Sequence, residues 1–145
     1  MSAPEGVELT FPDDGGCFGC SPSNPVGFHL RFRRDGARVS STCRVADRFH
    51  GAPGVAHGGI VATLLDEISC AAAVFLADVF VVTGELAVRY LAPVPVEAPL
   101  ELEAEIVART HPRYAEIAAC VRRGDAVLAR STGKFFYHSR PEPAP

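Results

Sequence analysis

The sequence predicts an α+β fold in which one antiparallel β-sheet of about five or six strands covers a single long helix. The clearest observation is an Ala- and Leu-rich run over residues 57–77, whose length and composition are typical of a helix. Two β-rich segments precede this run and four follow it. Because the strands do not alternate with further helices, the sheet has one helix to cover.

The two early strands are predicted from alternating apolar and polar residues. Residues 28–33 alternate, Gly36 supplies a turn, and residues 38–45 alternate again. The four late strands are rich in β-forming residues and are separated by breaks that contain proline or glycine. These strands are expected over residues 79–91, 100–108, 114–122 and 126–137.

One domain is expected, because 145 residues suffice to bury a core and no repeat interrupts them. Residues 1–16 contain Pro, Gly and acidic residues and few apolar ones, so they are predicted to be a weakly ordered lead-in. Residues 139–145, with three prolines, are predicted to be a flexible tail. The predicted domain therefore spans residues 17–138.

Composition argues against several classes of partner. The 14 Lys and Arg residues stand against 17 Asp and Glu residues without a basic run, so no nucleic-acid partner is expected. The most apolar segment, residues 60–77, is interrupted by Asp66 and Glu67, so no membrane span is expected. Five cysteines without a secretory signal are expected to be free thiols in a reducing cytoplasm.

A helical projection divides the predicted helix into two faces. At 100° per residue an apolar stripe forms one side, and Asp66 falls on the opposite side among small residues. This small face leaves room for a ligand or for a second helix. The alternative is that Asp66 is solvated, as most acids opposite a core stripe are. The stripe comprises Val61, Leu65, Ile68, Ala72, Phe75 and Leu76, and the small face comprises Gly59, Ala62, Ser69, Cys70 and Ala73.

The predicted helix begins with His57-Gly58-Gly59 and has no Ser, Thr, Asp or Asn cap. The first N–H groups of a helix need partners, and uncapped donors can serve a ligand oxygen. The paired glycines allow close approach, and the helix dipole favours a developing negative charge. This pattern indicates an oxyanion hole, with a flexible loop-to-helix junction as the alternative.

The spacing between His57 and Asp66 has a consequence for assembly. Nine residues at 1.5 Å rise place the two roughly 13 Å apart along the helix axis. One helix therefore cannot bring both to one carbonyl group. If they act together, two antiparallel copies have to face each other across a two-fold axis, which predicts at least a homodimer with shared sites.

The pattern resembles the hotdog-fold acyl-CoA thioesterases of the phenylacetyl-CoA and 4-hydroxybenzoyl-CoA types, over nearly the whole chain. Together the matching segments are specific, although each alone is weak. They are Cys17-Phe18-Gly19-Cys20 with residues 24–28, residues 49–59, Leu64-Leu65-Asp66, and residues 83–93.

The resemblance implies a sheet wrapped around one central helix and a hydrolase that acts on acyl thioesters without a cofactor. It implies that Asp66 is the nucleophile or general base, that Gly58 donates its backbone N–H to the thioester carbonyl, and that the Thr83 hydroxyl assists. Where some relatives carry Asn or Gln six positions before the motif His, this chain has Gly51, with His50 as a candidate substitute. The expected catalytic residues are Asp66, Gly58, His57 and Thr83, and the expected substrate contacts are Gly59, Ser69, Cys70 and Gly84.

Cys17 and Cys20 could indicate a metal or a redox pair. A structural zinc site needs four ligands, and Cys43, Cys70 and Cys120 are isolated in sequence, so no metal is expected. A redox pair of the thioredoxin kind lacks its βαβ context. Cys70 is expected to pack rather than to react. Glu67 points off the small face and is the second-choice acid, expected to be solvated or paired.

Four arginines lie at the ends of neighbouring predicted strands and could meet the phosphates of coenzyme A, although such residues are usually only solvated. They are Arg109, Arg113, Arg122 and Arg123.

Two alternatives to hydrolysis stay open: a hotdog dehydratase or hydratase, in which His57 would perform proton chemistry, and a binding module that holds acyl-CoA without cleaving it. The acyl group, a carrier-protein thioester in place of CoA, and a tetramer in place of a dimer are equally open.

Overall fold

The computed structural model describes residues 3–13 and 15–139. In these residues one long helix accompanies seven strands and a short 3-10 helix, Asp47–Phe49. The helix is α1 (Gly58–Ala77), and the strands are β1 (Glu8–Leu9), β2 (Phe32–Asp35), β3 (Arg38–Cys43), β4 (Val81–Tyr90), β5 (Leu100–Ala108), β6 (Tyr114–Arg123) and β7 (Ala126–Tyr137).

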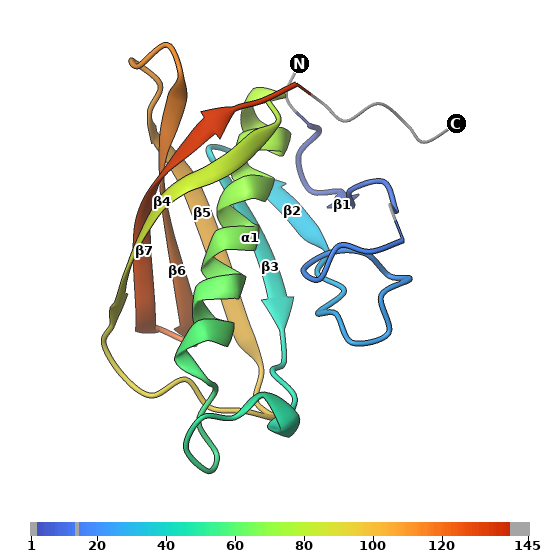
Figure 1. The fold of residues 1–145 in the computed structure, drawn as a ribbon, viewed down its shortest axis with the longest axis vertical. Helices are drawn as coiled ribbons and strands as arrows, with labels where there is room; N and C mark the ends of the chain where they lie inside the picture. Colours follow the sequence, from blue (N-terminus) through green and yellow to red (C-terminus); the bar gives the residue numbers. More distant parts are fainter. Residues whose placement is uncertain (1–2, 14, 140–145) are drawn as a thin grey trace.

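The strands form one antiparallel sheet in the order β1-β2-β3-β5-β6-β7-β4, and α1 lies along one face of it (Figure 1). The predicted α+β class, one helix covered by an antiparallel sheet, is confirmed. The strand count is seven rather than five or six. The additional strand is β1, whose Leu9 pairs with Phe32 of β2. Two residues are too short a segment to show an alternating pattern in the sequence.

Alternation along the strands explains how the sheet contacts the helix. In β5, Leu100, Leu102 and Ala104 are buried towards α1, while Glu101 is exposed and Glu103 is half-buried between them. The same period of two continues through β6 and β7. The largest fully buried side chains come from both layers: Phe32, Phe135, Leu64, Leu65, Ile68, Leu100, Leu102 and Ile117.

The first predicted strand is displaced along the chain. Residues 28–33 alternate in sequence, but β2 begins only at Phe32. His29 has a positive φ of 54°, which interrupts an extended conformation. Instead, the N–H groups of Phe28 and Leu30 donate to the carbonyl oxygens of Phe18 and Gly19, so this segment folds back on the loop that precedes it.

Helix α1 is buried over a wider surface than the predicted stripe. Val61, Leu65 and Ile68 are buried as expected, but Ser69 and Ala73 of the predicted small face are fully buried as well. Asp66 and Cys70 of that face are half-buried. The small face is therefore divided, because part of it packs into the core and part borders the edge of the sheet.

By length and composition, α1 is the one helix among the described residues that could cross a membrane. Nine of its residues are buried inside this fold, which is the environment of a core helix.

The predicted division into lead-in, domain and tail stays a prediction. Within the lead-in, Phe11 packs against Phe32 at 5.5 Å and Phe75 at 5.0 Å between ring centroids. The N–H of Ala3 donates to the carbonyl oxygen of Phe75 at 2.8 Å. Most of the predicted tail, residues 140–145, lies outside the described residues.

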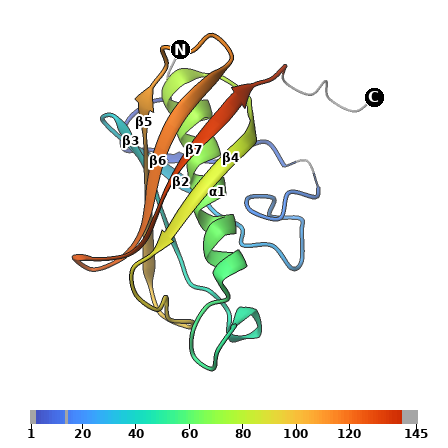
Figure 2. The same ribbon diagram turned by 60° about the vertical axis from the view of Figure 1, so that its left-hand side comes forward.

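Strand β4 forms one edge of the sheet and directly follows the helix (Figure 2). It pairs with β7 along its whole length, and the register shifts between Thr83 and Glu85. The shift is a bulge at Gly84, the kind of irregularity that reorients neighbouring side chains at a sheet edge. Among the described strands, β7 is the one partner of β4, so its other edge is open.

Candidate active site

The start of α1 has a cap that the sequence did not reveal. The Nδ1 atom of His57 accepts a hydrogen bond from the N–H of Gly59 at 2.9 Å, and His57 has the extended ψ of 137° that precedes a helix. The expectation of an uncapped helix start is therefore wrong for Gly59, since an imidazole can perform the task usually given to Ser or Asp. Because Nδ1 accepts, a neutral His57 carries its proton on Nε2.

The N–H of Gly58 is the donor that remains available. In the part of the chain that the structure describes, no group accepts a hydrogen bond from it. Its carbonyl oxygen accepts a hydrogen bond from the Tyr90 hydroxyl at 2.6 Å, which fixes the orientation of the residue. Gly58 is exposed, so a free, oriented N–H at the positive end of a 20-residue helix faces solvent.

The carboxylate of Asp66 lies against the edge strand. Thr83 Oγ1 donates to Asp66 Oδ1 at 2.6 Å, and the Cys70 Sγ lies 3.9 Å from the same hydroxyl. All three side chains are half-buried between α1 and β4. The structure thus brings together two of the predicted catalytic residues, Asp66 and Thr83, from positions 17 residues apart in the chain.

Cys70 and Ser69, two of the predicted substrate contacts, lie in different surroundings. Burial, followed by the charge of Asp66, raises the pKa of the Cys70 thiol to about 12, so the group stays protonated at neutral pH. The Ser69 hydroxyl is fully buried and donates to the carbonyl oxygen of Leu65 at 2.7 Å. Cys70 thus borders the Asp66 carboxylate as a thiol, while Ser69 faces the interior of this chain.

Two glycines near the site accommodate other groups of the protein. A Cβ at Gly84 would lie 2.3 Å from the ring of Phe136, so this glycine makes room for an aromatic side chain on β7. A Cβ at Gly51 would lie 3.2 Å from the Cα of His57. The loop before α1 therefore leaves little space for the amide side chain that some relatives carry there. His50 uses its Nδ1 on the carbonyl oxygen of Asp47.

Gly58 and Asp66 stay far apart within one chain. Both belong to the same continuous helix, and eight residues correspond to about 12 Å along its axis. No fold of this chain that keeps α1 intact can close that separation. The structure therefore presents two half-sites, a backbone donor at the helix start and a carboxylate beside the open edge of β4.

Glu67, the second-choice acid, is paired away from Asp66. Its carboxylate lies beside the loop of Cys17 and Cys20, with Cys17 Sγ 3.9 Å from Glu67 Oε1. Burial raises the pKa of the Cys20 thiol, and the adjacent Cys17 and the charge of Glu67 raise it further. This proximity of residues 50 positions apart gave no signal in the sequence.

One of the four strand-end arginines is paired with acids. Arg122 donates to Glu101 at 3.0 Å and also to Glu103, so its charge is already balanced. The guanidinium of Arg113 lies 6.0 Å from the ring centroid of Phe136. Neither observation places these residues near Asp66, and contact with phosphates stays a prediction.

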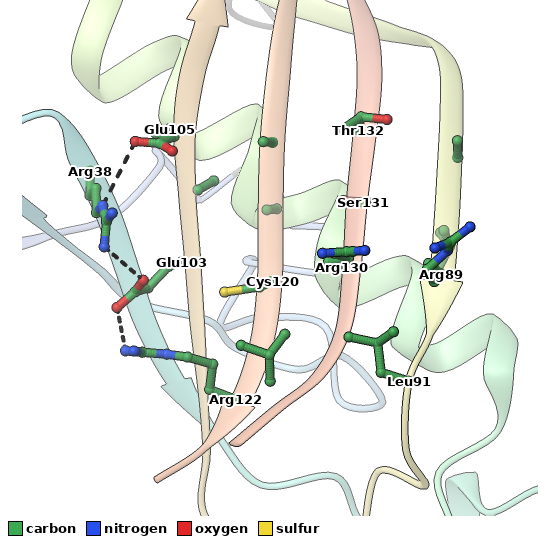
Figure 3. A pocket seen from close by; sticks show the side chains of 16 residues that line it. Arg38, Arg89, Leu91, Glu103, Glu105, Cys120, Arg122, Arg130, Ser131 and Thr132 are labelled. Carbon is green, nitrogen blue, oxygen red and sulfur yellow. Dashed lines mark hydrogen bonds and ion pairs between the residues drawn. The ribbon is translucent and has the colours of Figure 1, made fainter. Parts of the chain in front are cut away.

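A hollow of about 740 Å³ lies on the other face of the sheet, and no residue of α1 lines it (Figure 3). Its outward-facing side chains include Glu103 with its ion-pair partners Arg38 and Arg122. Arg130 of β7 and Arg89 of β4 lie opposite each other across the strand pair. The hollow contains neither Asp66 nor Gly58, so the candidate site is separate from it.

Three solved structures illustrate what the chain is similar to. A thioesterase superfamily protein superposes with a TM-score of 0.76 at 26% identity, covering 81% of this chain and 58% of that one. This chain thus spans a little over half the length of that relative. A thioesterase superfamily protein from Shewanella loihica PV-4 gives 0.63 at 28% identity, covering 76% and 91%. A Streptococcus mutans protein, solved bound to acetyl CoA, gives 0.68 at 21% identity, covering 78% and 91%.

A comparison with curated proteins gave no match. The sequence profile of the Thioesterase superfamily, in contrast, matches residues 53–130, more than half of the chain. The matched region contains the helix start, Asp66 and Thr83. The profile, the shared hotdog architecture and the two half-sites agree, and the chain belongs to the thioesterase superfamily.

Proposed function

We propose that this protein hydrolyses the thioester of an acyl-CoA to a free acid and a thiol, with Asp66 as the catalytic carboxylate. The observation that carries the proposal is the 2.6 Å hydrogen bond from Thr83 to Asp66, half-buried beside an open sheet edge. A solvated surface acid has no need of such an oriented partner. Membership of the thioesterase superfamily supports the same chemistry.

In the proposed reaction the Gly58 N–H binds the thioester carbonyl oxygen and stabilises its negative charge as the carbonyl carbon is attacked. Asp66 either attacks that carbon or removes a proton from the attacking water. A carbon–oxygen bond forms, the carbon–sulfur bond breaks, and the thiolate leaves with the bonding pair. If Asp66 is the attacking group, water then hydrolyses the resulting mixed anhydride, which releases the acid and restores the carboxylate. Because a thiolate is a good leaving group, the site needs oxyanion stabilisation and a positioned base more than a strong acid.

Thr83 acts as a positioning residue in this mechanism. Its hydroxyl donates to Oδ1 of Asp66 and so fixes the plane of the carboxylate, which leaves Oδ2 for water or for the substrate carbon. His57 has a related task at the other half-site, where its imidazole caps Gly59 and holds the helix start in shape. Gly58 and Asp66 therefore carry the chemistry, and His57 and Thr83 hold them in place.

The complete site is proposed to form between two copies of the chain. The separation of about 12 Å along α1 requires a second helix start near each Asp66. The open edge of β4 supports such an arrangement, because a ten-residue exposed strand edge readily pairs with another strand. A two-fold axis at this edge would continue the sheet and bring two copies of α1 together antiparallel.

The proposal that coenzyme A carries the acyl group is based on proteins similar to this chain. The Streptococcus mutans protein was solved bound to acetyl CoA and a Streptococcus pneumoniae protein with coenzyme A. Both share the fold of this chain, and the substrate of this protein is proposed by analogy with them. Phe80 and Leu86 on or beside β4 suit aryl and alkyl groups alike.

A thiol-release assay over short-chain, long-chain and aryl-CoA substrates tests the proposal. We expect release of free CoA from at least one class and its loss in Asp66→Asn. Absence of release from every class would favour a binding module. If water is instead added to an enoyl-CoA, and His57→Ala abolishes this while Asp66→Asn spares part of it, the chain is a hydratase.

A further inference from the structure

Three side chains of metal-ligating type meet beside α1, outside the candidate active site. Cys17 and Cys20 lie on the loop before β2, and Glu67 lies on α1. Their ligand atoms all lie within 4.8 Å of one another, and all three residues are half-buried. The two sulfur atoms are 3.0 Å apart, and Cys17 Sγ is 3.9 Å from Glu67 Oε1. Sequence alone had offered two ligands, and the fold supplies a third.

The loop holds its thiols in a defined arrangement. The backbone N–H of Cys20 points to Cys17 Sγ at 3.4 Å, and the N–H of Ser21 donates to the carbonyl oxygen of Cys17 at 3.0 Å. The carbonyl oxygens of Phe18 and Gly19 accept hydrogen bonds from the chain that returns after the loop. These contacts fix the turn that carries both sulfur atoms before any ligand binds.

Gly19 shows how closely Glu67 approaches this loop. A Cβ built on Gly19 would lie 2.3 Å from Cδ of Glu67, so no other residue fits there unless the carboxylate moves. The carboxylate is therefore packed directly over the turn that connects the two cysteines. This close approach distinguishes the cluster from acids that merely share a surface with a thiol.

We propose that Cys17, Cys20 and Glu67 bind one thiophilic divalent cation, with zinc as the best fit and water as the fourth ligand. Two thiolates and one carboxylate form a donor set that zinc accepts, and the thiols release their protons as the cation binds. Tetrahedral zinc sets its sulfur ligands about 3.8 Å apart and a sulfur and an oxygen about 3.6 Å apart. The observed separations of 3.0 Å and 3.9 Å reach these values through shifts of under about 1 Å.

The cation would link the loop before β2 to the middle of α1. Its ligand on the helix, Glu67, directly follows Asp66, so the link also fixes the segment that carries the candidate catalytic acid. Such a link closes a loop of the chain in the way that a disulfide does and would stabilise the fold.

Cobalt(II) is a suitable probe, because it replaces zinc and its bonds to thiolates absorb light. The full chain is prepared with a phosphine reductant, stripped of metal with a chelator, exchanged into chelator-free buffer and titrated with Co²⁺. We expect one equivalent to bind, with a sulfur-to-cobalt charge-transfer band and the visible bands of tetrahedral cobalt. Zinc should then displace the cobalt and bleach both sets of bands.

Matched variants assign the ligands. Cys17→Ser and Cys20→Ser should each weaken the binding of cobalt by about tenfold or more and reduce the charge-transfer band. Glu67→Gln keeps both thiols and should weaken binding by about tenfold or more while the band at saturation persists. Cys43→Ser and Cys120→Ser remove thiols elsewhere and should leave the titration unchanged. Circular dichroism of each variant controls for unfolding.

Thermal unfolding provides a second readout. A cation that binds only the folded chain raises its Tm, so zinc should raise the Tm of the wild type and of Cys120→Ser more than that of Glu67→Gln. The proposal is overturned if wild-type protein gives no charge-transfer band with Co²⁺ although a thiol reagent shows that its cysteines are reduced. A band unchanged in Cys17→Ser or Cys20→Ser, or an affinity for cobalt unchanged in Glu67→Gln, would equally overturn it.

Discussion

Asp66 and Glu67 are neighbouring acids on α1 that contact different parts of the molecule. Asp66 accepts a hydrogen bond from Thr83 on the edge strand, whereas Glu67 lies against the thiols of Cys17 and Cys20. Successive residues of a helix point about 100° apart, so adjacency in sequence directs the two carboxylates to different neighbours. The element that packs against each acid, rather than its residue type, decides the chemistry available to it.

Replacing the two acids should have opposite effects on hydrolysis and on cobalt binding. Asp66→Asn should abolish most hydrolysis and leave the affinity for cobalt unchanged. Glu67→Gln should weaken cobalt binding and lose far less hydrolysis than Asp66→Asn. Equal losses in both assays from either variant would mean that the two acids act as one cluster.

The largest effect is expected for Asp66→Asn. The amide keeps the shape of the side chain but can neither attack nor accept a proton, so kcat should fall by about 100- to 10,000-fold. Steady-state thiol release measures this loss. The matched control is Glu85→Gln, an exposed acid on β4 whose partner is Lys134 at 3.9 Å, and it should retain activity. An Asp66→Asn enzyme with near wild-type kcat would remove the carboxylate from the mechanism.

Gly58→Pro should have the second largest effect, because proline removes the one backbone N–H under test. Gly58 is the first residue of α1, where proline is favoured, and His57 has the extended ψ of 137° that precedes proline readily. Losing one oxyanion donor should lower kcat by about 100- to 1,000-fold while the helix remains folded.

Gly58→Ala is the control for Gly58→Pro, since it adds a Cβ but keeps the N–H. That Cβ would lie 3.5 Å from the Tyr90 hydroxyl, an ordinary contact, so the fold should accept it. Alanine should therefore retain much more activity than proline. If both variants lose activity equally, space rather than the donor matters at Gly58.

Thr83→Val should have a smaller effect, because it removes the hydroxyl that orients Asp66 but leaves the acid itself. The lost hydrogen bond to a half-buried carboxylate corresponds to about tenfold in kcat, with KM changed little. Thr83→Ser restores the hydroxyl and should recover most of the loss. A serine variant as poor as valine would show that the methyl group, not the hydrogen bond, is needed.

The smallest effect is expected for Tyr90→Phe. This change removes the hydrogen bond to the Gly58 carbonyl oxygen at an exposed position, which contributes about 1 kcal/mol. We expect a reduction of kcat of about fivefold and little change in Tm. A loss as large as that of Gly58→Pro would instead give the tyrosine hydroxyl a direct role in the reaction.

Much of the fold is predictable because the sequence patterns are local. Residues 57–77 and 100–108 were expected as helix and strand, and α1 and β5 occupy Gly58–Ala77 and Leu100–Ala108. The alternation of β5 also indicates which side chains face the helix. Predictions were wrong where contacts remote in sequence decide the outcome, as at β1, which exists only because Leu9 pairs with Phe32.

The candidate site likewise has a part that could be predicted from the sequence and a part that could not. The motif at the helix start and its spacing to Asp66 are visible in the sequence, and they are the basis of the proposal that a second chain completes the site. The His57 cap was missed because histidine is rare in that role, and Glu67 was missed as a neighbour of Cys17 because loop packing over 50 residues leaves no periodic signal. Contacts between side chains of different elements can be identified only in the folded chain.

The central claim is that Gly58 of one chain and Asp66 of another complete each site, and mixing two inactive variants tests it most directly. Asp66→Asn and Gly58→Pro chains are unfolded together, refolded at equal amounts, and assayed for thiol release. Shared sites predict recovery of about a quarter of wild-type activity, because half of the dimers are mixed and each mixed dimer has one intact site. A mixture no more active than its two parents would contradict the account.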